Sequence, residues 1–431
     1  MSTQVTAMII IAVTVVLFVI NKLRPALVSL MAVVALTAFG VLDFSKAFSG
    51  FSNNTIMLIA GMMVIGLALI ENGIADIIAK VIFEKFNKRP MALMIAILVS
   101  SAVLSAFLQN MAMLVVYFAI IDAYVVKSNG SLKRKTLYMI AMIGTLIGGS
   151  ATLAGSSSPG IASNILEELG GGSFSFFEPV CVGLPVLIIV SICYPLFIHR
   201  LSEKQFYPNG ETDDIPALIA AGVGKTEEKT IIKWKMWASA AVAVATTLSF
   251  IFVTSIKSGI LALIGACILM ASGCITSKKV IKDLDWSVLI LLACTTGLAN
   301  GFVATGLDVK MIDWLTSALG DKSSNAALWV IIFTFMSGII TNVISNSSAC
   351  AIFSALAVSV AAAAGCSPRP LIMACMWGSC SGISLPISCA TVSMSMAGGL
   401  NVKNYLTIGT LYSVIMWIVT AASIIVWYGL I

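Results

Sequence analysis

An uncharged run of 46 residues, 323–368, constrains this chain most, because a polar cluster interrupts it near its middle. Residues 341–348 read TNVISNSS, with two Asn and four hydroxyl side chains. A polar group without a partner costs several kcal/mol in hydrocarbon, so such a cluster needs partners, water or a ligand. The run therefore predicts a membrane segment that holds something polar inside the bilayer.

A second segment carries the same pattern. Residues 105–112 read SAFLQNMA, and a shift of 236 positions places Ser105 on Thr341 and Asn110 on Asn346. The chain that follows also corresponds, since residues 135–144 align with 369–378 at an offset of 234. A polar segment that occurs twice within the membrane is typical of a transporter built as an inverted repeat, in which such segments line the substrate pathway.

The composition indicates an integral membrane protein. Only 10% of the residues are charged and 59% are hydrophobic, whereas soluble domains carry about 25% charge. The basic residues lie in loops between apolar segments, so the net charge of +6 does not suggest a nucleic-acid partner. With a single His, no CxxC and no nucleophile–base pair, the sequence also argues against a metal centre and against an enzyme.

The predicted fold is an all-α polytopic membrane protein built as an inverted repeat. The halves are residues 1–200 and 232–431, joined by a cytoplasmic linker at 201–231, and each half has five crossings plus one re-entrant hairpin. We expect the hairpins at 90–126 and 323–366, and the broken helices at 136–169 and 370–402. Alternatively, each long segment could form two full membrane spans joined by a surface turn. That arrangement would leave the halves oppositely oriented as well, so the charges cannot exclude it. The recurrence of the polar tip just before each broken helix favours a re-entrant hairpin.

The distribution of charge predicts the orientation. With the loop at 127–135 in the cytoplasm, cytoplasmic loops hold 20 of the 25 Lys and Arg residues. Cytoplasmic loops of membrane proteins carry an excess of these residues. The count favours ten crossings, with both termini outside.

The broken helices suggest the chemistry. Residues 150–160 read SATLAGSSSPG and 384–391 read SLPISCAT, so Pro and Gly interrupt both helices. Helix N-termini starting near Asn110, Pro159, Asn346 and Thr391 would meet at mid-membrane, where their free N–H groups suit an anion. Unwound carbonyl groups suit Na⁺. Since we expect no charged side chain at this depth, dipoles, hydroxyls and amides would hold the anion. Ordinary kinks are the alternative.

Three further motifs carry a family resemblance: LDFSKAFSGFSN at 42–53, DWSVL at 285–289 and SPRP at 367–370. Over nearly its whole length the chain resembles the divalent anion:sodium symporter family, within the ion-transporter superfamily. The resemblance implies two re-entrant hairpins, a homodimer in the lipid bilayer of the cell (inner or plasma) membrane, and elevator-type movement of a transport domain against a scaffold.

The resemblance also implies site residues. The family marks each tip with Ser-Asn-Thr; both Asn remain here, but the first tip has Gln109 and Met111 in place of the hydroxyls. Substrate would contact the tips and breaks, at Gln109, Asn110, Met111, Ser156, Ser157, Ser158, Ser345, Asn346, Ser347, Cys389, Ala390 and Thr391. Sodium would bind at Ser105, Asn110 and Gly155, and at Thr341, Asn346 and a carbonyl near Ser388.

These features favour a secondary active transporter for a small anion resembling a di- or tricarboxylate, with Na⁺ as the coupling ion. A Na⁺-independent exchanger of the same fold remains open as an alternative. A channel is a further alternative, but a channel requires a continuous lined pore rather than two hairpins that meet at a closed site.

The topology gives the first testable prediction. A Cys probe at Lys133 or Gly224 should react with a membrane-impermeant thiol reagent only from the cytoplasmic side, and a probe at Asp321 only from outside. Labelling of right-side-out and inverted vesicles measures this. Labelling of the Asp321 probe from the cytoplasm would remove the inverted repeat.

Overall fold

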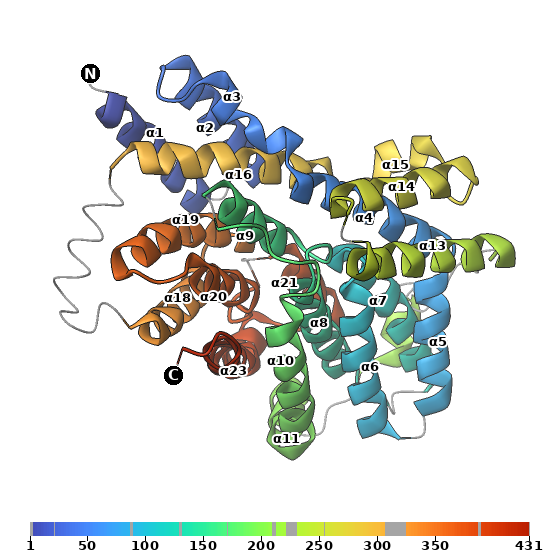
Figure 1. Cartoon of the computed structure of the whole chain (residues 1–431). Helices are drawn as coiled ribbons and strands as arrows, with labels where there is room; N and C mark the ends of the chain where they lie inside the picture. The colour runs from blue at the N-terminus through green and yellow to red at the C-terminus, as the bar shows by residue number, and fades with distance from the viewer. Residues whose placement is uncertain are drawn as a thin grey trace.

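The computed structural model describes residues 3–20, 22–86, 89–128, 132–169, 171–208, 213–220, 231–253, 255–306, 325–386 and 389–430. The regular elements within these ranges are all helices (Figure 1). Of the positions named above, Ser388, Gly224 and Asp321 lie outside the described ranges.

One set of helices, here called the scaffold group, forms a band from the upper left to the right side of Figure 1. Within it, α2 packs against α1 and α16, and α4 packs against α14. The members are α1 (Thr3–Ile20), α2 (Pro25–Ala38), α3 (Phe44–Ala47), η1 (Ser49–Ser52), α4 (Asn54–Glu71), α13 (Lys233–Phe252), α14 (Ser258–Ala271), α15 (Ser277–Asp283) and α16 (Trp286–Ala304).

The remaining helices, here called the hairpin group, come from both halves of the chain. The first half gives α5 (Ile74–Phe86), α6 (Pro90–Ser105), α7 (Asn110–Lys127), α8 (Arg134–Ala151), α9 (Ser157–Glu168), α10 (Val180–Cys193), η2 (Tyr194–Ile198), α11 (His199–Phe206) and α12 (Ile215–Ala220). The second half gives α18 (Ala326–Ile340), α19 (Asn346–Ala364), α20 (Pro368–Cys380), α21 (Ala390–Ser395), η5 (Met396–Gly398), α22 (Val402–Asn404), η6 (Tyr405–Gly409) and α23 (Thr410–Trp427).

Both helices of each hairpin pack against the helix that follows the hairpin in the chain. α8 packs against both α6 and α7, and α20 packs against both α18 and α19. Two glycines make these contacts close: a Cβ atom on Gly144 would lie 2.1 Å from Ser101 Oγ, and one on Gly378 would lie 2.1 Å from Ser337 Oγ. The same close approach therefore recurs at equivalent positions of the two halves, although their opposed orientation stays a prediction.

The helices are those of a multi-pass membrane protein. Six in the described ranges are long and apolar enough to cross a membrane, or seven if the bent segment from α10 to α11 counts as one span. Five more apolar helices are shorter, among them α6, α14 and α18. At 1.5 Å per residue, α14 is about 21 Å long, less than the ~30 Å hydrocarbon core. The all-α membrane fold is confirmed, whereas ten crossings remain a prediction.

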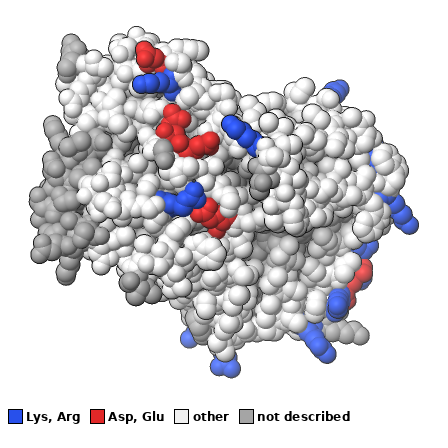
Figure 2. All heavy atoms as spheres, viewed as in Figure 1, with Lys and Arg blue, Asp and Glu red and all other residues white. Residues whose placement is uncertain are grey.

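Charged side chains are sparse, and the face in Figure 2 shows them in a cluster above and left of its centre and along its right and lower edges. Each ion pair between described residues joins positions that the charge distribution assigns to the same side of the membrane. The pairs are Lys133–Glu203, Arg134–Asp122, His199–Glu203 and Lys279–Glu71 on the cytoplasmic side, and Arg369–Glu178 outside. These contacts are compatible with the predicted topology; the domain boundaries stay predictions.

The two glycines at the close contacts between hairpin and following helix, Gly144 and Gly378, give a stability prediction. Gly144→Ala and Gly378→Ala should each destabilise the protein by about 1–3 kcal/mol, because the added methyl group overpacks a helix crossing. Thermal unfolding of the detergent-purified protein measures this. Val103→Ile, which adds one methylene to an exposed face of α6, is the control and should unfold like wild type. An unchanged melting temperature in both glycine variants would contradict the conclusion that these helix crossings leave no room for a methyl group.

Candidate functional site

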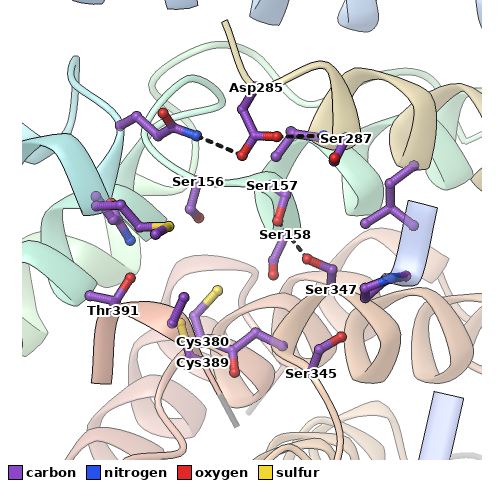
Figure 3. A pocket seen from close by; sticks show the side chains of 18 of the residues that line it. Ser156, Ser157, Ser158, Asp285, Ser287, Ser345, Ser347, Cys380, Cys389 and Thr391 are labelled. Carbon is purple, nitrogen blue, oxygen red and sulfur yellow. Dashed lines mark hydrogen bonds between the residues drawn. The ribbon is translucent and has the colours of Figure 1, made fainter. Parts of the chain in front are cut away.

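A cavity of about 680 Å³ lies where both hairpin tips and both helix breaks meet the scaffold group. Its lining includes all twelve predicted substrate-contacting residues: Gln109, Asn110, Met111, Ser156, Ser157, Ser158, Ser345, Asn346, Ser347, Cys389, Ala390 and Thr391. Figure 3 shows these segments gathered round one space, with the serines of the first break between Asp285 and Cys389. Residues separated by more than 280 positions in the chain therefore share one site.

The half-helices begin close to the predicted positions. α7 starts at Asn110 and α19 at Asn346, as expected. α9 starts at Ser157, earlier than predicted, because Pro159 falls in the first turn, where a helix does not need the missing N–H. α21 starts at Ala390, also slightly early. Ser345 caps α19 by accepting a hydrogen bond from Ser348 N at 3.2 Å.

Each tip Asn accepts a hydrogen bond from the hydroxyl five residues before it. Ser105 Oγ donates to Asn110 Oδ1 at 2.7 Å, and Thr341 Oγ1 donates to Asn346 Oδ1 at 2.9 Å. Thr341 Oγ1 also lies 2.9 Å from the carbonyl oxygen of Ser379. In each tip, the two side chains predicted to bind sodium are therefore in contact, and their oxygen atoms form a cluster of hard ligands.

The first helix break presses against the first tip. A Cβ atom on Gly149 would lie 2.0 Å from Asn110 Oδ1, and one on Gly155 would lie 2.4 Å from the carbonyl oxygen of Ser105. Only glycine allows the unwound chain to approach the tip this closely. Gly155 therefore lies close to Ser105 and Asn110, the other two residues of the first predicted sodium site, whereas Ser388 of the second predicted site is outside the described residues.

The first break offers the cavity a hydroxyl that forms no hydrogen bond of normal geometry with the residues that the structure describes. Ser156 Oγ is buried, lines the cavity and forms no hydrogen bond with the described residues. Buried polar atoms in proteins normally have a partner, so Ser156 Oγ is available to a ligand. Beside it, the hydroxyls of Ser157 and Ser347 lie 2.6 Å apart and join the two halves across the cavity (Figure 3).

Sequence reasoning missed the charged residues of the site. Arg24 and Asp285 line the cavity from the scaffold group. Each directly precedes a helix, α2 or α16, so both lie at the ends of spans, which the expectation of no charged side chain at mid-depth did not cover. Asp285 Oδ2 accepts from Gln109 Nε2 at 3.1 Å, and Asp285 Oδ1 accepts from Val288 N at 3.3 Å. An Asp before an apolar run signals a helix cap; nothing local to this position signals its second contact with a hairpin tip.

Comparison with known proteins identifies the family. Residues 15–378 match the family described as citrate transporter. The chain belongs to this family. The match confirms the resemblance found in the sequence, and both the family and the relative SdcS are described as transporters rather than enzymes.

Individual relatives are distant. The chain is 23% identical to the sodium-dependent dicarboxylate transporter SdcS of Staphylococcus aureus over 433 residues, which cover 93% of this chain and 80% of SdcS. It is 27% identical to the uncharacterized transporter YfbS of Escherichia coli over 188 residues, 44% of this chain and only 30% of YfbS. The YdaH transporter of Alcanivorax borkumensis has a similar fold, with a TM-score of 0.62 at 14% identity over 94% of this chain and 98% of YdaH.

The paired Asn residues give a functional prediction. Asn110→Ala and Asn346→Ala should each abolish transport without unfolding the protein, since loss of a ligand costs about 1–3 kcal/mol, or ten- to a hundredfold in affinity. Asn54→Ala is the matched control, because Asn54 bonds Ser258 away from the cavity. Uptake in proteoliposomes measures the effect; wild-type uptake by either tip variant would make the tips structural turns.

Proposed function

We propose that this chain is a secondary active transporter that carries a small anion, resembling a di- or tricarboxylate, together with Na⁺. The observation that supports it most is the convergence of both tips and both breaks on one cavity. The N-termini of α7, α9 and α19 contribute free N–H groups and partial positive charge there.

The anion would be bound by short polar groups from both halves. Ser156 Oγ forms no hydrogen bond of normal geometry with the described residues and can donate to the anion, and the hydroxyls of Ser345 and Ser347 flank Asn346. Arg24 is the one basic residue among the described residues that line the cavity, and it has no ion pair with them within 4.0 Å. A positive side chain at the rim attracts anions into the cavity.

Sodium would bind as cargo at the two oxygen clusters. Each contains an amide oxygen and a hydroxyl oxygen already within hydrogen-bonding distance, at Asn110 with Ser105 and at Asn346 with Thr341. An ion at Asn110 Oδ1 would displace the donated hydroxyl hydrogen and leave the Asn amide N–H groups for the anion. The relative SdcS is described as sodium-dependent, which supports the same coupling here.

Movement would follow an elevator scheme, in which the hairpin group shifts against the scaffold group of a homodimer. α13 is evidence for a partner subunit that contacts the scaffold group, because only 11% of the apolar stretch of this helix is buried within the chain. Trp234 and Trp237 on this helix are 55% and 69% exposed. A second copy of the chain and lipid would share the uncovered face.

Counterflow in proteoliposomes with a panel of labelled anions, with and without Na⁺, tests the proposal. A Na⁺-coupled transporter should show saturable counterflow that needs Na⁺ on the substrate side. Counterflow that is independent of Na⁺ would favour the exchanger, and an unsaturable flux without counterflow would favour a channel.

The first tip predicts the preferred substrate. Met111 is 41% exposed and places a thioether where the family has a hydroxyl, so one end of the substrate should be less polar or less charged than a carboxylate. Met111→Thr should raise the preference for a symmetric C4-dicarboxylate over an asymmetric anion about tenfold. Competition against labelled substrate measures the ratio.

The test uses a single substitution at Met111 and a matched methionine control on α4. Replacing Gln109 as well would break its bond to Asp285, so the single Met111 variant is cleaner. Met57→Thr on α4, which is exposed and outside the cavity lining, is the matched control. If wild type already prefers succinate or fumarate to every asymmetric anion, the idea is wrong and Met111 only packs.

A further inference from the structure

The position of the cavity along α16 reveals which way the site faces. α9 runs beside α16 in the same direction: Asn164 Nδ2 donates to Thr296 Oγ1 at 2.6 Å, and Asn300 Nδ2 donates to Glu168 Oε1 at 3.0 Å. Ser157 lies seven residues before Asn164, which is about 10 Å along the helix. The start of α9 is therefore level with the first turns of α16, where Val288 and Leu291 line the cavity.

The first turn of α16 belongs to the cytoplasmic side in the predicted topology. It follows directly after α15, whose Lys278, Lys279 and Lys282 are among the cytoplasmic basic residues, and Lys279 pairs with Glu71 at the cytoplasmic end of α4. Arg24, which also lines the cavity, precedes α2 at the same side. In this predicted topology the cavity lies towards the cytoplasm rather than at the middle of the scaffold group.

The tip of the first hairpin rests on the scaffold group at this level. A Cβ atom on Gly66 of α4 would lie 3.2 Å from the carbonyl oxygen of Phe107. Two residues further on, the Gln109 amide donates to Asp285 at 3.1 Å. The Asp285 carboxylate is held in place by Val288 N, so it meets the tip as a fixed acceptor. A hydrogen bond to an ionised acceptor is stronger than one between neutral groups.

We propose that Asp285 is a latch that holds the first hairpin tip on the scaffold in the cytoplasm-facing state of the transport cycle. This inference rests on the proposed function. When the hairpin group moves outward, Gln109 must leave Asp285, because Asp285 is fixed to the first turn of α16. Asp285 therefore acts as a positioning residue: it sets how long the site faces the cytoplasm.

The native thiol of Cys389 reports the direction of the site, since it lines the cavity. A membrane-impermeant methanethiosulfonate is added to one side of right-side-out or inverted vesicles, and modification of the Cys389 peptide is quantified by mass spectrometry. Wild type should be labelled mainly from the cytoplasmic side, and Cys389→Ser should give no signal at this position.

Gln109→Leu should raise the ratio of outside to cytoplasmic labelling about tenfold, the usual effect of losing a hydrogen bond to a charged group. Asp285→Ala should do the same but also removes the cap of α16, so Gln109→Leu, which keeps the cap, is decisive. The double variant should match the single ones, since both remove one interaction. Asp285→Asn, which keeps an acceptor oxygen, should restore part of the wild-type ratio.

Gln4→Leu is the matched control, because Gln4 bonds Thr305 within the scaffold group. Wild-type labelling ratios in Gln109→Leu, or additive effects in the double variant, would overturn the latch. Labelling needs no substrate, so it tests the latch even if counterflow finds no transported anion. Conversely, Na⁺-coupled counterflow with unchanged labelling ratios would leave the proposed function standing and reject the latch.

Discussion

The structure depends on one constraint: a helix that stops inside a membrane leaves backbone groups that water cannot satisfy. Here described residues of each break form hydrogen bonds with the neighbouring hairpin tip. Asn342 Nδ2 donates to the carbonyl oxygen of Gly338 at 2.8 Å, while its Oδ1 accepts from Ser384 N at 2.9 Å. In the first half, Thr152 Oγ1 donates to the carbonyl oxygen of Ala106. A tip and a break thus satisfy each other.

The same constraint explains why the two halves share one site. After its break, the first half continues as α9, which packs on α19 and α20 of the second half, while α21 packs on α7 and α8 of the first. The half-helix after each break therefore packs against the other half of the chain, and α9 does so from its first residue, since the Ser157 hydroxyl lies 2.6 Å from the Ser347 hydroxyl at the second tip. A ligand at the cavity contacts both halves, so binding and the relative position of the halves are physically linked.

Much of this arrangement was predictable because it is local. Asn110 and Asn346 could be found from polar residues inside apolar runs, and Gly155 and Pro159 from the residues that break helices. The exact helix starts were less predictable, since Ser157 and Pro159 both fit a first turn. Asp285 was recognisable as a helix cap, but its bond to Gln109 joins residues 176 positions apart and leaves no local pattern.

The sequence by itself determined the membrane environment, the helical elements, the two tips and the two breaks, because the cost of burying polar groups acts on each segment alone. Only the tertiary structure decided that Arg24 and Asp285 face the cavity, that Gln109 points to the scaffold group, and how far along α16 the site lies. These features depend on how the two groups of helices pack against each other, and that packing joins residues far apart in the chain, so no local sequence pattern specifies it.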